Sequence, residues 1–230
     1  MRIGGFQNTS LLDYPNYISA IIWAMDCNFR CPFCYNKNIV FGKVEPIPEE
    51  EILSFLKKRK GLLEGLVITG GEPLLQEDIV DFIKKVKKLD YLVKIDTNGT
   101  FPEKLKEIID KKLVDYLSMD IKAPKNKYSK LAGIKADLTK IEQSIEIIQN
   151  NAPDYEFRTT FVPDLLKNED IIEIAKWLEG SKRFYLQQFK SDTSLISSKL
   201  EDVAPYSKED LFKILEKIKP FFKNCNVRGV

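Results

Sequence analysis

Residues 65–99 read GLVITGGEPLLQEDIVDFIKKVKKLDYLVKIDTNG and contain the unit that decides the fold. Two apolar, β-rich runs, GLVITG (65–70) and YLVKID (91–96), flank a stretch whose apolar residues have helical spacing, QEDIVDFIKKVKKL (76–89). A strand, an amphipathic helix and a second strand in this order predict two parallel strands joined by a crossover helix. The polar segments TGGEP and DTNG follow the two strands directly.

The same alternation runs along the chain and predicts six strand–helix units. We therefore expect an α/β fold, a partial (β/α)6 TIM-like barrel of parallel strands with outer helices, because a closed barrel needs eight units. Residues 1–17 are expected to form a hairpin or edge strand before the first unit. No linker rich in Gly, Ser or Pro divides the chain, so we expect a single domain over residues 1–230. The other expected strands are 18–25, 113–121, 156–162 and 183–189, and the other expected helices are 48–60, 101–112, 137–151, 168–180 and 207–219.

Composition excludes several classes of function. Hydrophobic residues make up 43% of the chain and charged residues 30%, as in ordinary globular proteins. Lys and Arg number 36 against 34 Asp and Glu, so the formal net charge of +2 indicates no basic surface for nucleic acid. No apolar run is long enough for a membrane span, and the first residues lack a signal-peptide pattern. We expect a cytoplasmic protein without nucleic-acid or membrane partners.

Three of the four cysteines, Cys27, Cys31 and Cys34, lie within MDCNFRCPFCYN (25–36), and the fourth is Cys225. In a reducing compartment, such clustering indicates metal binding or catalysis rather than disulfides. Three thiolates can hold three irons of a cubane cluster and leave the fourth iron open. One alternative is a structural zinc site completed by Cys225, although the chain has no histidine, the commonest zinc co-ligand. The other is a set of unlinked core cysteines, and Cys225 by itself is expected to be a small core residue.

Further polar residues are expected at the carboxyl ends of the strands, where parallel α/β folds place their chemistry. Gly70 and Gly71 in TGGEP (69–73) let the backbone approach a ligand closely, and Glu72 could face a cationic amine. DTNG (96–99) has the residues of a turn, so a turn without a binding role is the alternative to a site there. MDIK (119–122) places Asp120 and Lys122 on the same side of a strand, so an ion pair without a binding role is the alternative there. Together with polar residues in the last two expected strands, these segments predict one continuous pocket.

The segment CNFRCPFC, with the aromatic Phe33 before its last cysteine, resembles the signature of the radical S-adenosylmethionine (SAM) superfamily. NTSLLDYP (8–15) followed by CNFRCPFCYN is similar, more closely, to the activating enzymes of glycyl radical enzymes. Within these it is most similar to the activating proteins of anaerobic ribonucleotide reductase and to pyruvate formate-lyase activase. TGGEP, DTNG, MDIK and the terminal NVRG also fall where that family has similar segments, so the resemblance covers nearly the whole chain.

The resemblance implies a [4Fe–4S] cluster on Cys27, Cys31 and Cys34, with SAM on the open iron. An electron from the cluster would cleave SAM to methionine and a 5′-deoxyadenosyl radical. This radical would take a hydrogen atom from a glycine of a partner glycyl radical enzyme, for which anaerobic ribonucleotide reductase is one candidate. The implied electron donor is a flavodoxin or a ferredoxin. The residues to which the family's SAM-binding role carries over are Phe33, Gly70, Gly71, Glu72, Thr97, Asn98, Asp120 and Lys122.

The sequence departs from the family pattern at three points. Tyr35 follows the third cysteine where close relatives commonly have histidine, and Asp26 replaces a glycine before the first. The late-barrel histidine of pyruvate formate-lyase activase is absent, and Gln187, Gln188 and Lys190 are the polar residues nearby. Two alternative functions remain. One is a minimal radical SAM enzyme acting on a small molecule, of the deazapurine synthase kind, whose relatives lack the NTSLLDYP-type segment. The other is a zinc-stabilised binding module without catalysis.

Overall fold

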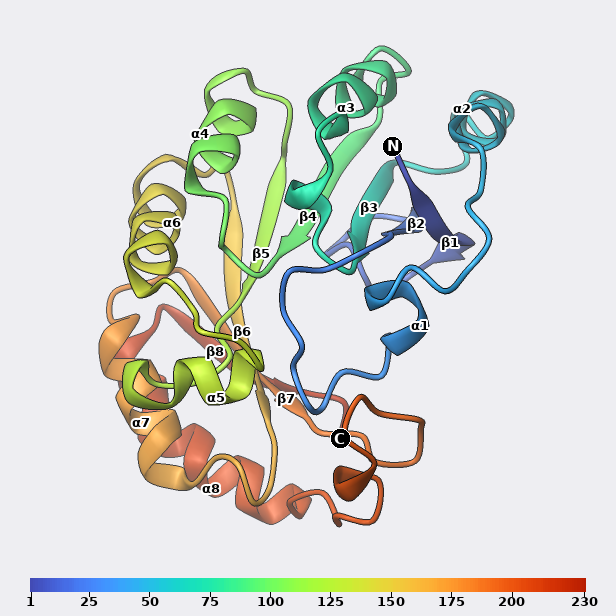
Figure 1. Cartoon of the computed structure of the whole chain (residues 1–230). Coiled ribbons are helices and arrows are strands. Elements are labelled where there is room, and N and C mark those ends of the chain that lie inside the picture. The colour runs from blue at the N-terminus through green and yellow to red at the C-terminus, as the bar shows by residue number, and fades with distance from the viewer.

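The computed structural model describes residues 1–230, and its eight strands form one continuous sheet that follows the order of the sequence (Figure 1). The first two strands are antiparallel, and every later neighbour is parallel. Parallel strands with helices outside them confirm the predicted fold class. The strands are β1 (Ile3–Ser10), β2 (Ser19–Ala24), β3 (Gly65–Gly70), β4 (Leu92–Thr97), β5 (Tyr116–Asp120), β6 (Tyr155–Phe161), β7 (Arg183–Gln188) and β8 (Asn224–Arg228).

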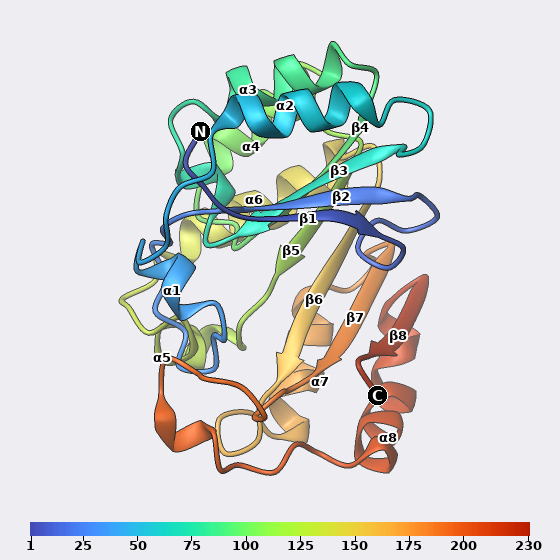
Figure 2. The same cartoon turned by 90° about the vertical axis from the view of Figure 1, so that its right-hand side faces the viewer.

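The helices follow each other around the outside of the curved sheet, as Figures 1 and 2 show from two sides. All six predicted helices are present, and β1 is the predicted edge strand. The structure also contains three elements that the sequence did not predict: the short helices α1 and α5 and the last strand, β8. The helices are α1 (Lys37–Val40), α2 (Glu49–Lys58), α3 (Ile79–Lys87), α4 (Pro102–Asp110), α5 (Tyr128–Ala132), α6 (Leu138–Asn151), α7 (Asn168–Trp177) and α8 (Lys208–Ile218).

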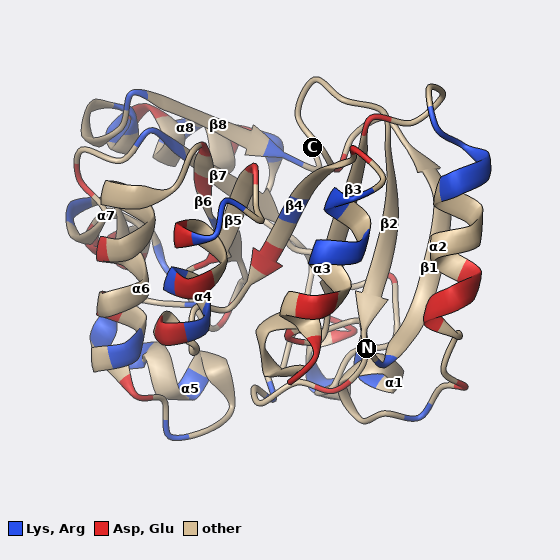
Figure 3. Cartoon of the chain, turned by 90° about the horizontal axis from the view of Figure 1, so that it is seen from above, with Lys and Arg blue, Asp and Glu red and all other residues tan.

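Helix α3 shows how the outer helices are fixed to the sheet. Its apolar residues Ile79, Phe82, Ile83 and Val86 lie on one face and are fully buried. Its lysines and acids face outward, and Figure 3 shows that both signs of charge occur on α2, α3 and α4. An amphipathic helix with this spacing is stabilised by packing on the sheet rather than by its intrinsic propensity. No helix of the structure is both long and apolar enough to cross a membrane.

Strands β2 to β6 are largely buried on both faces, as expected for a parallel sheet covered by helices, whereas the edge strands β1 and β8 have exposed residues. In β3, Leu66 and Ile68 belong to the main core, whereas Val67 belongs to a small second cluster with Tyr14 and Tyr116. Tyr14 comes from the turn between β1 and β2, and Tyr116 is the first residue of β5. The second cluster therefore packs the amino end of the barrel and leaves the carboxyl ends of the strands for polar residues.

Candidate active site

A cavity of about 420 Å³ lies at the carboxyl ends of the strands and extends into the barrel. Its size is within the range of small-molecule sites. Every predicted site residue except Glu72 lines this cavity, so the sequence segments that were expected to meet do meet. The predicted residues in its lining are Cys27, Cys31, Phe33, Cys34, Gly70, Gly71, Thr97, Asn98, Asp120 and Lys122.

The cysteine loop after β2 is held by backbone hydrogen bonds on several sides. Within the loop, the amide of Cys34 donates to the carbonyl of Cys31 at 3.0 Å, and the amide of Phe29 donates to Cys27 Sγ at 3.3 Å. The amide of Arg30 donates to the carbonyl of Ala132, the last residue of α5, at 2.8 Å. These contacts fix the loop before any ligand binds.

The three thiols are free and largely buried, which suits a metal cluster. Burial raises the pKa of Cys27 to about 12 and that of Cys31 to about 11, and it also raises the pKa of Cys34. The thiols are therefore protonated on their own, and iron would have to displace their protons on binding. No three metal-ligating side chains converge on one ion position. A cubane cluster takes one thiolate on each of three irons, and the three free thiols of this loop can supply them.

Cys225 lies away from the other cysteines. It is the second residue of β8, pairs in register with Phe184 near the start of β7, and is 8% exposed within the main core. The cysteine loop follows the carboxyl end of β2, whereas Cys225 is at the amino end of its strand. The zinc alternative thereby loses its fourth ligand, and the prediction of a small core residue is confirmed.

The glycines of TGGEP allow the end of β3 to touch the start of the cysteine loop. A Cβ on Gly71 would lie 1.8 Å from the carbonyl oxygen of Asp26. A Cβ on Gly70, whose φ is +117°, would lie 2.5 Å from the amide nitrogen of Ala24. The missing side chains therefore allow the end of β3 to pack against residues 24–26, which lead into the cysteine loop. The same two glycines line the cavity.

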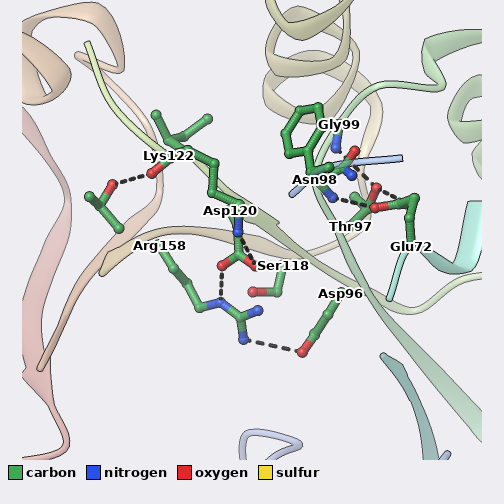
Figure 4. A network of polar contacts seen from close by, with 12 residues as sticks. Glu72, Asp96, Thr97, Asn98, Gly99, Ser118, Asp120, Lys122 and Arg158 are labelled. Atoms are coloured by element: carbon green, nitrogen blue, oxygen red, sulfur yellow. Dashed lines mark hydrogen bonds and ion pairs between the residues drawn. The ribbon is translucent and has the colours of Figure 1, made fainter. Parts of the chain in front are cut away.

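Glu72 lies behind the cavity and is fully buried. Its carboxylate accepts hydrogen bonds from Thr97 Oγ1 at 2.8 Å and from the amide of Asn98 at 2.7 Å (Figure 4). It also accepts one from the amide of Leu74 at 3.0 Å. Burial raises the pKa of Glu72 to about 7, although these three donors favour the carboxylate form. Glu72 therefore positions the DTNG turn relative to TGGEP.

The DTNG turn is also bonded to the cysteine loop. Asn98 Nδ2 donates to Asn28 Oδ1 at 2.9 Å, and Asn28 Nδ2 donates to Thr100 Oγ1 at 2.8 Å. Thr100 in turn donates to Asn98 Oδ1 at 2.6 Å, which closes the network. Sequence reasoning did not include Asn28 or Thr100 among the site residues, and only their position beside Cys27 and DTNG pointed to them.

Five charged side chains of alternating sign cross the barrel interior. Arg158 on β6 donates from Nε to Asp120 Oδ1 at 2.9 Å and from Nη1 to Asp96 Oδ2 at 3.2 Å (Figure 4). Lys122 Nζ lies 3.3 Å from Asp120 Oδ2, and Lys94 pairs with Asp96. Asp120 and Lys122 form the ion pair that was the alternative for MDIK, and the cavity also reaches both of them.

These pairs determine the charge states in the cavity. Burial alone would raise the pKa of Asp120, but the charges of Arg158 and Lys122 hold it well below its usual range. Burial lowers the pKa of Lys122, and Asp120 more than reverses this effect, so the lysine stays protonated. The lining thus carries fixed charges of both signs, which suits a zwitterionic ligand with a carboxylate and an ammonium group.

The last two predicted strands divide their polar residues between the cavity and the surrounding structure. Arg158, Thr160 and Gln187 line the cavity. Thr159 instead donates to the carbonyl of Ile121 at 2.9 Å. Gln188 borders the cavity, but its Nε2 donates to the carbonyl of Tyr206 at 2.7 Å.

The residues that depart from the family pattern also have defined places. Tyr35 borders the cavity and remains 59% exposed, and Lys190 borders it as well. Asp26 adopts a positive φ of 65°, the conformation that a glycine would take without strain, and forms an ion pair with Arg2.

The chain is similar to several known proteins. Residues 21–179 match the family described as the radical SAM superfamily. Over 99% of this chain and 96% of the relative, the sequence is 33% identical to a Methanocaldococcus jannaschii protein described as "Putative glycyl-radical enzyme activating enzyme". The crystal structure of Streptococcus suis SuiB bound to S-adenosylmethionine aligns with a TM-score of 0.71 at 18% identity, over 91% of this chain and 50% of SuiB. SuiB bound to the precursor peptide SuiA aligns with a TM-score of 0.69 at 19% identity, over 90% and 47% of the two chains.

The partial barrel, with its cavity at the carboxyl ends and its loop of three free cysteines, defines an enzyme of the α/β barrel class. The chain belongs to the radical SAM superfamily. Enzymes of this family use a [4Fe–4S] cluster and SAM, and these are the cofactors of the present enzyme. The chain spans about half the length of SuiB, so that likeness describes the fold alone.

Proposed function

We propose that this enzyme activates a partner glycyl radical enzyme and that Cys27, Cys31 and Cys34 hold its cluster. The observation that carries the proposal is the convergence of three free thiols and fixed charges of both signs in one cavity. The similarity over 99% of the chain to a relative described as an activating enzyme supports the choice of substrate. When bound, the reduced cluster would supply one electron that cleaves SAM to methionine and a 5′-deoxyadenosyl radical, which takes a hydrogen atom from a glycine of the partner.

The chain's own residues would bind and orient SAM. Arg158 uses Nε and Nη1 for Asp120 and Asp96, and its Nη2 makes no hydrogen bond within the chain, so it can donate to a carboxylate. Lys122 would add a second positive charge, and Asp120 would remain ionised beside the ammonium group. The Asn28–Asn98–Thr100 network would keep the turn rigid and limit reorganisation. Transfer of a hydrogen atom needs no general base, and the chain has no histidine to serve as one.

A protein substrate fits the shape of the site. The cavity lining includes Asp13 from the β1–β2 turn and Arg228 and Gly229 from the end of β8. The site thus reaches both unpaired edges of the sheet, and a polypeptide segment of a partner could enter between them. SuiB, a protein of the same fold, has been crystallised with a precursor peptide. A flavodoxin or ferredoxin would supply the electron.

Electron paramagnetic resonance on anaerobically purified protein tests this function. The reduced enzyme with SAM should produce a protein-borne glycyl radical on a co-expressed candidate partner such as anaerobic ribonucleotide reductase. Formation of 5′-deoxyadenosine without a radical on any candidate partner would favour the small-molecule alternative. A colourless zinc protein without iron and sulfide would exclude radical chemistry altogether.

A further inference from the structure

Exposed apolar side chains gather at one place on the molecule. Nine large hydrophobic residues are exposed, and five of them lie in two loops, the β1–β2 turn and the loop before β3. Leu12 is 90% exposed, Leu11 72% and Leu62 63%. Contiguous exposed apolar side chains on a globular protein commonly mark an interaction site. We call this set the hairpin patch, and its members are Leu11, Leu12, Tyr17, Ile18 and Leu62.

The two loops form one surface because they are bonded to each other. The amide of Glu64 donates to the carbonyl of Ile18 at 2.8 Å, and the amide of Ile18 donates to Glu64 Oε2 at 3.0 Å. Figure 2 shows both loops on the right, at the opposite end of the β1–β2 ribbon from α1. Residues 11, 12 and 62 are therefore presented on adjoining loops rather than scattered singly.

The fold gives no reason for leucines at this turn. Leu11 and Leu12 lie in the connection of residues 11–18 between β1 and β2, and both project into solvent rather than pack on the core. The turn is nevertheless well ordered, because Ser10 Oγ accepts from the amides of Leu12 at 3.1 Å and Asp13 at 3.2 Å. Tyr14, 2% exposed, anchors the turn from below in its cluster with Tyr116. A surface that is ordered before binding loses little conformational entropy when a partner docks.

The hairpin patch is continuous with the cavity through Asp13. This residue directly follows Leu12 in the chain and lines the cavity. A polypeptide segment that enters the cavity past Asp13 would therefore bring the rest of its protein close to Leu11 and Leu12.

We infer that the hairpin patch is the docking surface for the protein substrate and binds an apolar surface beside its glycine-bearing segment. The inference rests on the proposed function and adds to it a binding surface outside the cavity. The occupant is the substrate protein rather than a second copy of this chain, because a second copy seated there would cover the Asp13 side of the cavity. Affinity for the whole partner would then exceed affinity for its isolated segment.

The test compares two substrates with one double variant. L11S/L12S should raise the KM for the full-length partner by about tenfold or more, as expected when central apolar anchors are truncated. A short peptide that carries only the partner's glycine segment should react with unchanged KM. Partner-free 5′-deoxyadenosine formation and cluster content should stay at the wild-type level, because neither leucine side chain is part of the cavity lining. The matched control is F212S, which truncates an exposed aromatic on α8 and should change neither KM.

Each other outcome has a definite meaning. If wild-type enzyme forms no glycyl radical on any partner, the proposed function fails and the docking inference falls with it. If wild-type enzyme forms the radical and L11S/L12S has the same KM for the whole partner, only the docking inference is overturned. An equal loss with protein and peptide would show that the leucines act on the cavity. A change in the sedimentation coefficient of the enzyme alone would assign the patch to self-association.

Discussion

Glu72 shows how a single buried carboxylate can organise a site without lining it. Its two oxygens accept from Thr97, Asn98 and Leu74, so TGGEP and DTNG are joined by a side chain that no ligand need touch. A buried carboxylate is costly unless such donors compensate for its lost hydration. The position of Asn98, which does line the cavity, therefore depends on Glu72.

Replacing Glu72 by Gln should destabilise the protein and weaken SAM binding. A glutamine amide presents one acceptor oxygen where the carboxylate has two, so at least one buried donor loses its partner. We expect a loss of about 2 kcal/mol in the free energy of unfolding, measured with urea. Calorimetry with the reconstituted enzyme should show lower SAM affinity. The control T97S keeps the hydroxyl that bonds Glu72 and should bind SAM nearly as wild type does; equal losses in both variants would contradict the positioning role.

Substituting the cysteines one at a time should separate the cluster ligands from the core cysteine. Serine at position 27, 31 or 34 should reduce iron and sulfide to background and abolish 5′-deoxyadenosine formation, because a cubane needs three thiolates in this loop. The control C225S should keep full iron content and activity, since Cys225 lies at the opposite end of the sheet. Iron loss in C225S with an intact fold would assign a ligand role to Cys225 after all.

At the residue scale, the sequence predicted the lining of the cavity better than the way in which that lining is held. Cys27, Gly71 and Asn98 stand in short motifs at strand ends, and such motifs are readable because the fold brings strand ends together. Asn28 is a spacer position within the cysteine motif and Thr100 directly follows DTNG, and their roles depend on two loops meeting in space. Such partners become visible only from tertiary contacts.

At the scale of elements, the short helix α5 supports the cysteine loop. Arg30 donates to the last residue of α5, and the next residue, Gly133, has a φ of +68°. A Cβ on Gly133 would lie 2.0 Å from the carbonyl oxygen of Arg30. The end of α5 and the middle of the cysteine loop therefore touch backbone to backbone.

Alanine at Gly133 should displace the cysteine loop and reduce cluster loading. Gly180 is a matched control, because it follows α7 with a φ of +82° and no atom lies within 4 Å of the position that a Cβ would take there. Both substitutions should cost about 1 kcal/mol for the left-handed backbone. Only G133A should also lose most of its iron after anaerobic reconstitution. Equal iron content in the two variants would show that the loop adapts without loss.

Element length decided which parts of the fold were predictable. The strands from β2 to β7 and their six outer helices have clear apolar periodicity, and all of them are present. The four residues of α1 and the five of α5 are too short for a helical period to appear. The five residues of β8 begin with the exposed Asn224, so their apolar content alone did not indicate a strand. Pairing with β7 determines their conformation.

At the scale of the whole molecule, one ion pair ties the last strand to the barrel interior. Arg228 on β8 donates from both terminal nitrogens to Glu156 on β6, at 2.6 and 2.7 Å. Its guanidinium also lies 3.4 Å from the ring centroid of Tyr185, on the strand between them. Glu156 is fully buried and also accepts from Tyr116 and Ser118. These contacts hold the edge strand β8 to both β7 and β6.

Removing Arg228 should reverse the way in which ionised Glu156 changes the free energy of unfolding with pH. Burial alone would raise the pKa of Glu156, but Arg228 and the charge of Arg158 hold it below its usual value of 4.5. In the wild type, the unfolded chain therefore binds the proton more readily, and the stabilisation is complete above about pH 4.5 and lost as pH falls through the lowered pKa. Without Arg228, burial dominates, the pKa rises, and the folded state gains relative stability on acidification.

The variant R228M should lose about 3 kcal/mol at pH 7, because it removes the only cation that is hydrogen-bonded to the buried carboxylate. Urea unfolding at pH 7 and pH 5 should show the deficit relative to wild type shrinking at the lower pH, as Glu156 becomes protonated in the folded variant. The double variant E156Q/R228M removes both charges and should recover most of the stability at pH 7. A deficit that is the same at both pH values, and that persists in the double variant, would mean that the stacking of Arg228 on Tyr185 holds β8 in place instead.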